Sequence, residues 1–162
     1  MSEDRITIEE AKEQDLEAIM EIERLSFPSY PYSIDFFKTL LKDCGKYFLL
    51  SKIGSMALGY VCGRIFRGKF GEIVSIAVIP SFRRRGIGRE LMLELESRFK
   101  KDSIRVTRLE VSVKNTAAVK FYEALGYEVI NLTRSYYPDG SDAFIMVKFL
   151  EEAGEEISHN NN

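Results

Sequence analysis

The most informative segment of this chain is Val78-Ile79-Pro80-Ser81-Phe82-Arg83-Arg84-Arg85-Gly86-Ile87-Gly88-Arg89. A β-branched run ends at Pro80, three arginines and two glycines follow, and an amphipathic helix is expected over residues 87–100. Gly86 and Gly88 carry no Cβ, so a bulky anion can approach the backbone closely. The free N–H groups at the start of the helix, its positive pole and the arginines would all favour that anion. The segment therefore predicts a binding site for a pyrophosphate.

Two common phosphate-binding loops do not fit this segment. A Walker loop needs Gly-Lys-Ser/Thr after four intervening residues, and a dinucleotide-binding loop needs a third glycine. The spacing here is Arg83-x-x-Gly86-x-Gly88. Taken alone, the same residues also suit an arginine-rich helix start whose glycines only shape a turn. The segment by itself leaves both interpretations open.

Size and composition indicate one globular domain. The chain has 162 residues, of which 45% are hydrophobic and 30% charged, as is ordinary for a soluble protein. We expect the domain to span residues 1–150 and the polar tail at 151–162 to be disordered. The formal net charge of −2 argues against a nucleic-acid partner. No apolar run is long enough to span a bilayer and no signal peptide opens the chain, so we expect no membrane partner and a cytoplasmic location.

Cysteine and histidine positions argue against metal chemistry and against a nucleophile activated by histidine. Cys44 and Cys62 have neither a CxxC nor a metal-ligand spacing, so reduced core thiols are expected. The single histidine, His159, lies in the polar tail. This position removes a Ser-His or Cys-His pair and most metal chemistry. We therefore expect no metal, and acid–base work falls to carboxylates, tyrosines or thiols.

Apolar periodicity and turn residues predict a mixed fold. Strands are expected at residues 5–10, 47–53, 56–66, 70–79, 105–113, 127–136 and 143–149. Helices are expected after Asp15, after Ser33, after the loop at residues 83–89 (the glycine loop) and after Asn115. In the first helix, either Ile22 or Leu25 completes the inward stripe. Residues 70–113 form a strand–helix–strand unit, which predicts one right-handed parallel crossover in an otherwise antiparallel sheet. The fold class is therefore α/β (α+β), a single domain with flanking helices.

Motifs in the second half of the chain are typical of one family. Leu109-Glu110-Val111 is followed by Asn115, by a helix of small residues with Tyr122, and by Leu125-Gly126-Tyr127. Thr133-Arg134-Ser135-Tyr136-Tyr137-Pro138-Asp139-Gly140 follows, and then Asp142-Ala143. Together with the glycine loop, these motifs resemble the RimI-type branch of the GNAT N-acetyltransferase superfamily. They occur in the expected order over roughly residues 5–149.

The resemblance implies a GNAT fold and an acetyl-CoA-dependent enzyme. RimI-type enzymes and their archaeal and eukaryotic relatives acetylate the N-terminal α-amines of proteins and peptides. We expect direct transfer in a ternary complex, because Cys44 and Cys62 lie outside the motifs and have no histidine partner.

The resemblance also implies the coenzyme contacts. It places the pyrophosphate on the backbone amides of Arg84, Arg85, Gly86, Ile87, Gly88 and Arg89, with Arg83 at the first motif position. It places the acetyl carbonyl and the pantetheine arm along Ile76, Ala77 and Val78, whose N–H groups would stabilise the developing oxyanion. Asn115 is implied near the coenzyme too, although a helix cap explains it equally well.

Two carboxylates are candidates for the general base and one tyrosine for the general acid. Glu110 matches the Leu-Glu-Val motif, but strand parity also places it on a polar sheet face, where a solvated glutamate is ordinary. Glu72 lies where other GNAT branches carry a catalytic glutamate; it is about 13 Å from Ile76 along an ideal strand and would act through water. We favour Glu110, with Glu72 second. Tyr122 is implied as the acid that protonates the departing thiolate, and the alternative is a core tyrosine with a solvated hydroxyl.

Two aromatic segments resemble the peptide-gripping elements of N-terminal acetyltransferases. The candidate substrate-binding residues are Phe27, Pro28, Tyr30, Tyr32, Tyr136 and Tyr137. Tyrosine offers a flat apolar face together with a hydroxyl for peptide backbone groups. Packing between a loop and a hairpin is the alternative for each residue.

Several alternatives stay open. The acceptor could be a small amine, a polyamine or a lysine, or the chain could be a coenzyme A-binding module without turnover. Such a module would keep the glycine loop but could dispense with Glu110 and Tyr122. The sequence does not determine the preferred N-terminal residues, whether a ribosomal protein is the substrate, or the oligomeric state.

Overall fold

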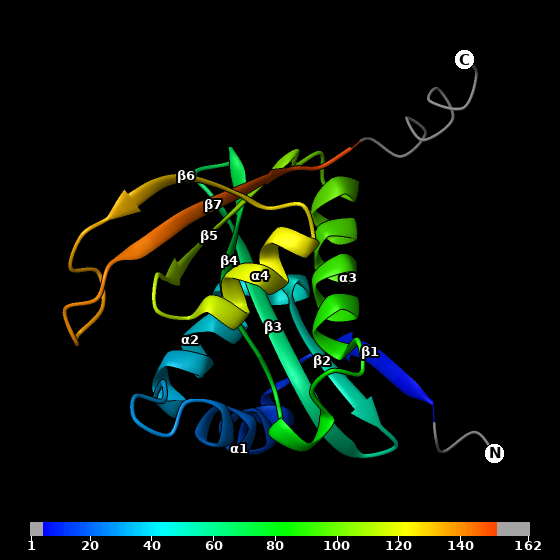
Figure 1. The fold of residues 1–162 in the computed structure, drawn as a ribbon. Helices are drawn as coiled ribbons and strands as arrows, with labels where there is room; N and C mark the ends of the chain where they lie inside the picture. Colours follow the sequence, from blue (N-terminus) through cyan, green and yellow to red (C-terminus); the bar gives the residue numbers. More distant parts are fainter. Residues whose placement is uncertain (1–4, 152–162) are drawn as a thin grey trace. The chain divides into compact units, whose positions relative to one another are not determined.

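The computed structural model of the protein describes residues 5–151 (Figure 1). Apart from Glu151, the predicted polar tail at 151–162 lies outside the described residues, and so does His159. Within the described range, no helix is long and apolar enough to cross a membrane. The domain boundary at residue 150 stays a prediction.

Seven strands between residues 5 and 151 form one mixed sheet, in the hydrogen-bonded order β1-β2-β3-β4-β5-β7-β6. They are β1 (Ile6–Glu10), β2 (Phe48–Ile53), β3 (Met56–Phe66), β4 (Phe70–Val78), β5 (Val106–Ser112), β6 (Glu128–Thr133) and β7 (Ala143–Phe149). Strands are antiparallel in the pairs β1–β2, β2–β3, β5–β7 and β6–β7, and parallel in β4–β5. The predicted mixed sheet with one parallel pair is confirmed.

The four predicted helices are also present: α1 (Leu16–Ser26), α2 (Ile34–Cys44), α3 (Ile87–Lys101) and α4 (Thr116–Ala124). Short 3-10 helices occur at η1 (Glu13–Asp15), η2 (Gly45–Tyr47) and η3 (Pro80–Phe82). The chain separates into two compact units. Among the described residues, the first unit is 5–64 with 73–98, and the second is 65–72 with 99–151. Strands β3 and β4 and helix α3 each contribute residues to both units.

Helix α1 buries one apolar stripe in the first unit. Leu16, Ile19 and Ile22 are buried, whereas Leu25 is 50% exposed. Ile22 therefore completes the inward stripe, as one of the two sequence alternatives predicted. A carboxylate, Glu23, also lies in the buried part of the helix.

The two predicted caps of this unit have different outcomes. The prediction that the Asp15 side chain caps α1 is wrong. Its carboxylate instead accepts the N–H of Lys12 at 2.9 Å and pairs with the Lys52 ammonium at 3.1 Å. The Ser33 cap of α2 is confirmed, because its Oγ accepts the N–H of Phe36 at 3.2 Å.

Aromatic rings fill the core of the first unit. Phe37, Phe48 and Tyr60 are fully buried, and their ring centroids lie 5.5 to 6.3 Å apart. Beside them, β3 passes very close to β4 at Gly59. A Cβ atom there would lie 2.8 Å from the carbonyl oxygen of Ala77, so only glycine allows this approach.

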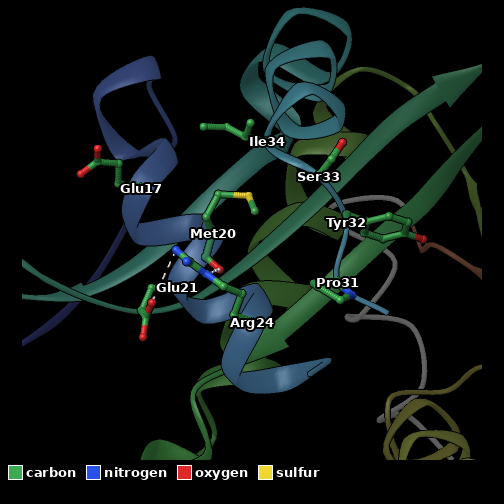
Figure 2. Close-up of a pocket in the computed structure, with 8 residues that line it drawn as sticks. All are labelled: Glu17, Met20, Glu21, Arg24, Pro31, Tyr32, Ser33 and Ile34. Atoms are coloured by element: carbon green, nitrogen blue, oxygen red, sulfur yellow. Dashed lines mark hydrogen bonds and ion pairs between the residues drawn. The ribbon is translucent and has the colours of Figure 1, made fainter. Parts of the chain in front are cut away.

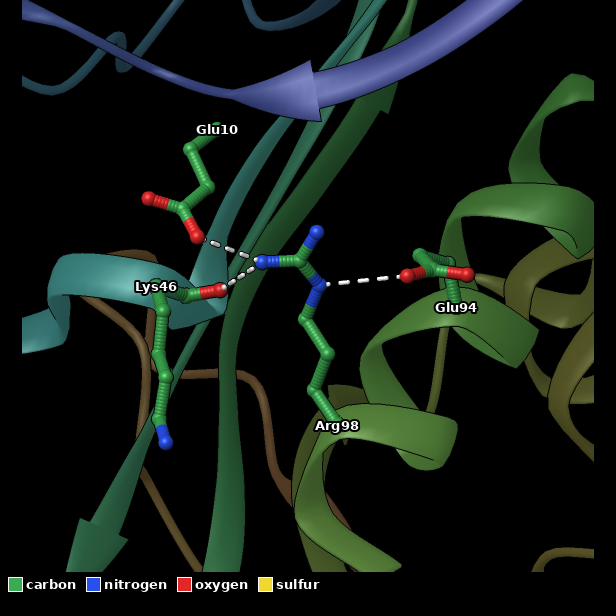
Figure 3. Close-up of polar contacts among 4 residues, drawn as sticks. All are labelled: Glu10, Lys46, Glu94 and Arg98. Carbon is green, nitrogen blue, oxygen red and sulfur yellow. Dashed lines mark hydrogen bonds and ion pairs between the residues drawn. The ribbon is translucent and has the colours of Figure 1, made fainter. Parts of the chain in front are cut away.

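Arg98 connects three elements of the first unit (Figure 3). Its Nη1 donates to Glu10 Oε1 of β1 at 2.8 Å and to the Lys46 carbonyl of η2 at 3.0 Å. Its Nε donates to Glu94 Oε1, one turn earlier in α3, at 3.2 Å. The Arg98 side chain is 23% exposed, so these charge-assisted bonds are partly shielded from water.

The second unit is built around β5. Residues alternate in burial along this strand, with Leu109 buried and Glu110 on the other face, as strand parity predicted. Helix α4 begins at the predicted cap, where Asn115 Oδ1 accepts the N–H of Ala118 at 3.1 Å. It ends before Gly126, whose φ of 99° is a left-handed conformation that favours glycine.

Strand β6 is shorter than predicted. It ends at Thr133, which pairs with Ala143, instead of continuing to Tyr136. The reason lies at Ser135, which has a φ of 51° and donates its N–H to the Asp142 carboxylate at 2.9 Å. A positive φ is incompatible with an extended strand, so the pairing stops and Tyr136 belongs to the connecting loop.

Candidate active site

The segment after β4 gathers backbone N–H groups at the N-terminus of α3. Arg84 and Gly86 have positive φ angles of 64° and 81°, so the chain bends sharply before Ile87, the first residue of α3. The first N–H groups of an α-helix have no acceptor within the helix. Across the described residues, the N–H groups of Arg84, Arg85 and Gly86 also have no backbone acceptor. These donors and the positive pole of α3 can together hold a doubly charged anion.

The side chains of this segment leave room and positive charge for a ligand. A Cβ atom at Gly86 would meet nothing within 4 Å, so the space beside this residue is open. Glycine is favoured here by the positive φ angle and not by a lack of space. Arg84, Arg85 and Arg89 are exposed. None of the three forms an ion pair with a carboxylate of residues 5–151. The guanidinium of Arg85 lies 4.7 Å from the ring centroid of Phe82.

Arg83 is used differently from its neighbours. Its Nε donates to the Val78 carbonyl at 3.0 Å, and its N–H donates to the Pro80 carbonyl at 3.3 Å. Both groups therefore hold the turn between β4 and α3. The local role of Arg83 in this structure is to shape the loop.

Ile76, Ala77 and Val78 form the end of β4. Ala77 is 6% exposed, and its two neighbours are half-buried. The parallel ladder with β5 pairs Gly71 and Glu72, at the start of β4, with Thr107 and Arg108.

Both candidate bases belong to one charged cluster of the second unit. Glu72 pairs in register with Arg108, and Arg108 Nη2 lies 3.3 Å from Glu110 Oε1. The Arg108 guanidinium also lies 5.7 Å from the ring centroid of Phe70. Partial burial raises the pKa of Tyr136, the charges of Glu110 and Glu72 raise it further, and Arg108 lowers it. The structure thus brings together three residues that were predicted from separate motifs.

Tyr122 lies in an apolar part of the second unit. It is 8% exposed, and its ring centroid lies 5.3 Å from that of Phe121 and 5.9 Å from that of Tyr127. Burial raises the pKa of Tyr122 well above its ordinary value, and the nearby Tyr137 adds to the effect. Its hydroxyl has no hydrogen-bond partner within residues 5–151. Tyr122 therefore keeps its proton at neutral pH and can donate it to a ligand. The side-chain oxygen of Asn115 is occupied as the α4 cap.

The predicted substrate segment between α1 and α2 is irregular and exposed. Tyr30 is 71% exposed, and Phe27 39%. Pro28 is exposed as well. The Tyr32 ring stacks on Phe36 at a centroid distance of 4.2 Å.

A groove of about 700 Å³ borders this segment (Figure 2). Its lining residues are Glu17, Met20, Glu21, Arg24, Pro31, Tyr32, Ser33 and Ile34. Tyr32 is thus the one predicted substrate residue among them.

The second predicted aromatic segment is the tyrosine pair of the β6–β7 connection. Tyr136 is 50% exposed, and its ring meets that of Tyr137 edge-to-face with the centroids 4.9 Å apart. Tyr137 is fixed by its main chain, which donates to the Ser141 carbonyl at 3.1 Å and accepts from the Gly140 N–H at 2.9 Å. The ring pair is therefore held by a closed turn.

The thiols are not arranged for covalent catalysis. Cys44 and Cys62 are buried, and burial raises the pKa of the Cys62 thiol well above its ordinary value, with Cys44 adding to the effect. Within the described part of the chain, no group of three or more His, Cys, Asp or Glu side chains is arranged to hold a metal ion.

Sequence reasoning missed a buried polar network in the first unit. Glu23 is 1% exposed, and its Oε2 accepts the hydroxyl of Tyr60 at 2.5 Å. The Tyr60 oxygen is also 2.8 Å from Ser75 Oγ. The other carboxylate oxygen, Oε1, accepts the N–H of Tyr32 at 3.0 Å. One signal was present, because Glu23 follows Leu16 by seven residues and so shares its face of α1.

Fold and site features agree with a match to a known family. The chain belongs to the acetyltransferase (GNAT) family, whose model matches residues 16–127. The glycine loop, β4, β5 and α4 all lie within the matched range.

Relatives and solved structures place the chain more closely. An N-alpha-acetyltransferase of Saccharolobus solfataricus is 33% identical, over 89% of this chain and 93% of that protein. The [ribosomal protein bS18]-alanine N-acetyltransferase of Escherichia coli K12 is also 33% identical, over 86% of this chain and 95% of that protein. The crystal structure of Ard1 from Thermoplasma volcanium superposes with a TM-score of 0.87 at 26% identity, over 91% of this chain and 99% of that chain. The resemblance stated from the motifs is confirmed.

Proposed function

We propose that this protein transfers the acetyl group of acetyl-CoA to the N-terminal α-amines of proteins or peptides. The observation that carries this function is the open anion-binding loop at the start of α3, in a chain similar over most of its length to an archaeal N-alpha-acetyltransferase. The Escherichia coli relative acts on an alanine of a ribosomal protein, which makes ribosomal proteins one candidate substrate class. A cytoplasmic location and the absence of a nucleic-acid partner stay predictions.

The glycine loop fits the diphosphate of coenzyme A. Arg84, Arg85 and Gly86, followed by the first turn of α3 with Ile87, Gly88 and Arg89, would offer main-chain N–H donors to it. Exposed arginines without carboxylate partners would add charge. We assign Arg83 to the same set through its hold on the Val78 carbonyl.

The end of β4 is proposed to orient the thioester. Ile76, Ala77 and Val78 end strand β4, and their main-chain groups could bind the acetyl carbonyl and the pantetheine arm. An N–H group aimed at the carbonyl oxygen would stabilise the negative charge that develops as the amine attacks. Asn115 is retained as a coenzyme neighbour by family resemblance, although its side chain serves the α4 cap.

Proton transfer is assigned to the second unit. Glu110 would take a proton from the attacking amine, with Glu72 as the second candidate, and Tyr122 would give one to the departing sulfur. The amine nitrogen bonds to the carbonyl carbon and the carbon–sulfur bond breaks, so one proton leaves the amine and one reaches the thiolate. Glu110 is partly shielded, with a side chain 17% exposed. Burial raises the pKa of Tyr122 and keeps it protonated, but the same rise opposes release of the proton to the thiolate.

The ordinary pKa of an α-amine favours N-terminal substrates. Deprotonating an α-amine with a pKa of about 7.8 at pH 7 costs about 1 kcal/mol, whereas a lysine amine with a pKa of about 10.4 costs about 5 kcal/mol. A single carboxylate, already engaged with Arg108, suits the first task better than the second.

Direct transfer from coenzyme to peptide is proposed in place of an acetyl-enzyme. A thiol must ionise to attack a thioester, and burial of Cys62 opposes its ionisation. The four residues Phe27, Pro28, Tyr30 and Tyr32, together with Tyr136 and Tyr137, would contact the peptide through their exposed apolar faces.

The decisive experiment uses radiolabelled acetyl-CoA and a peptide library varied at the first two positions. We expect label on the α-amine of a subset of peptides, and none on the same peptides when the α-amine is blocked. Label on lysines or polyamines alone would replace the N-terminal assignment. Coenzyme binding without transfer to any amine would mean that the protein is a coenzyme A-binding module without turnover.

A further inference from the structure

The loop between α1 and α2 is fastened at both ends to a single residue, Glu23. At the start of the loop, the Glu23 carbonyl accepts the N–H of Phe27 at 2.8 Å. At the end of the loop, the Glu23 carboxylate accepts the N–H of Tyr32 at 3.0 Å. The six exposed, irregular residues 27–32 are thus closed into a loop by the carbonyl and the carboxylate of one residue.

The other half of the carboxylate reaches the sheet. Glu23 Oε2 accepts the hydroxyl of Tyr60 on β3. Since that hydroxyl donates to Glu23, the 2.8 Å contact between Tyr60 and Ser75 is donated by Ser75 of β4. Ser75 is the residue before Ile76, where the acetyl carbonyl is proposed to bind. A continuous hydrogen-bonded chain therefore joins the loop to that part of β4.

Burying the Glu23 carboxylate costs free energy unless all of its hydrogen bonds are formed. Glu23 is 1% exposed and forms no ion pair with a lysine or arginine of residues 5–151. A buried carboxylate without a cation depends entirely on its hydrogen bonds. Removing the side chain would release the Tyr32 N–H and leave the Tyr60 hydroxyl with Ser75 alone. The loop would then lose this hydrogen bond at its Tyr32 end.

We propose that Glu23 is a positioning residue that fixes the peptide-binding loop at 27–32 relative to the acetyl end of β4. This role rests on the proposed function, because it requires that the loop contacts the peptide. Glu23 itself does not touch the reacting atoms. Its expected signature is a change in peptide KM with little change in the KM for acetyl-CoA.

The test compares the parent protein with Glu23→Ala, Glu23→Gln and Tyr60→Phe. Hydrogen exchange of residues 27–33, measured by mass spectrometry without substrate, reports on the loop directly. We expect exchange in Glu23→Ala to be about tenfold faster, and the peptide KM to rise by about tenfold, since one buried anchoring bond is lost. The KM for acetyl-CoA should change less than twofold.

Conservative variants separate positioning from folding. Glutamine can still accept the Tyr32 N–H and can donate its amide to Tyr60, whose own proton would turn to Ser75. Glu23→Gln should therefore restore most of the loop protection and the peptide KM. Tyr60→Phe removes both hydrogen bonds of the hydroxyl, to Glu23 and with Ser75, and keeps the bond between Glu23 and the Tyr32 N–H. It should therefore fall between the parent and Glu23→Ala, and it remains informative if Glu23→Ala does not fold. Glu21→Ala is the control, because Glu21 is 62% exposed on the same helix.

The outcomes are distinct. Unchanged exchange of 27–33 in both Glu23→Ala and Tyr60→Phe would overturn the attachment. Faster exchange with an unchanged peptide KM would overturn the positioning role. If the parent acetylates no peptide, the proposed function fails and the positioning role fails with it, while the exchange data still decide whether Glu23 holds the loop.

Discussion

The glycine loop of the first unit and the charged cluster of the second unit balance their charges in opposite ways. In the loop, Arg84, Arg85 and Arg89 have no carboxylate partner among residues 5–151. In the cluster, Arg108 lies against Glu110 and in register with Glu72. One arginine in the cluster is therefore compensated by the protein, whereas those of the loop are not.

This difference shows how each region can work. Uncompensated donors at a helix N-terminus attract an anion from outside the protein, so the loop is suited to binding. A compensated cluster attracts little net charge, but it holds carboxylates close to a tyrosine whose pKa they perturb. It is suited to moving protons. Substitutions in the loop should therefore change coenzyme affinity, and substitutions in the second unit should change turnover.

Charge reversal in the loop should have the largest effect. Arg84→Glu with Arg85→Glu replaces two attractive charges by two repulsive ones beside the proposed diphosphate, and we expect acetyl-CoA to bind about 100- to 1,000-fold more weakly. Isothermal titration calorimetry measures this change. Thermal stability should hardly change, because both side chains are exposed.

Lys38→Glu with Lys42→Glu is the matched control, since these lysines are exposed on α2 and change the net charge by the same amount. Equal weakening by both double variants would mean that the loop has no special role and that only overall charge matters. Unchanged affinity in the loop variant would remove the diphosphate site.

Glu110→Gln should come next and should act on turnover. The substitution keeps the shape but removes the proton acceptor, and we expect kcat to fall by about 100-fold, near the lower end for general base catalysis, because an α-amine is already partly neutral at pH 7. Coenzyme affinity should stay within about twofold. Steady-state kinetics with a peptide substrate gives both quantities.

Glu72→Gln distinguishes the two carboxylates. A loss of a few-fold fits a neighbour that tunes the cluster. If Glu72→Gln costs more than Glu110→Gln, the roles of base and neighbour must be exchanged.

Tyr122→Phe should have a smaller effect on kcat, of about tenfold. The loss is modest because a thiol with a pKa of about 8.5 leaves tolerably well without an acid. If the chemical step limits turnover and kcat is still unchanged, Tyr122 has only a packing role.

The same variant has a pH signature. Burial raises the pKa of Tyr122 in the folded protein, so the folded state keeps a proton that the unfolded state loses above pH about 10. The associated stability is fully present below that pH and is lost as the pH rises toward the folded pKa. Tyr122→Phe should therefore unfold less readily than the parent above pH 10, and equally at pH 7, as denaturant titration can measure.

Much of the fold followed from local patterns. The strands, the helices after Ser33 and Asn115, and the glycine loop are each encoded within about ten residues, by alternation, caps and positive-φ positions. The failures were also local in origin: Asp15 had a closer donor in Lys12, and the end of β6 was set by a bond from Ser135 to Asp142. Propensity alone does not show such competition.

The site was predicted less completely, because its contacts join distant segments. Parity placed Glu110 on the same face as Arg108 but could not show that they pair. Nothing near Glu23 in the sequence indicates Tyr60, 37 residues later. Polar networks of this kind depend on which strands become neighbours, and only the assembled fold decides that.

Arg98→Met is expected to have the smallest functional effect, and it tests a paired arginine against the unpaired arginines of the glycine loop. Arg98 is an arginine of the first unit whose charge is fully used inside the fold, through Glu10, Glu94 and the Lys46 carbonyl. Its loss should lower the free energy of unfolding by about 1–2 kcal/mol, because the side chain is only partly shielded and the glutamates can return to water.

Arg24→Met, which removes an exposed pair with Glu21, should cost under about 0.5 kcal/mol. Denaturant unfolding measures both changes, and the affinity for acetyl-CoA should be the same in both variants as in the parent. Weaker coenzyme binding by Arg98→Met would contradict the idea that paired arginines serve stability and unpaired arginines serve coenzyme binding.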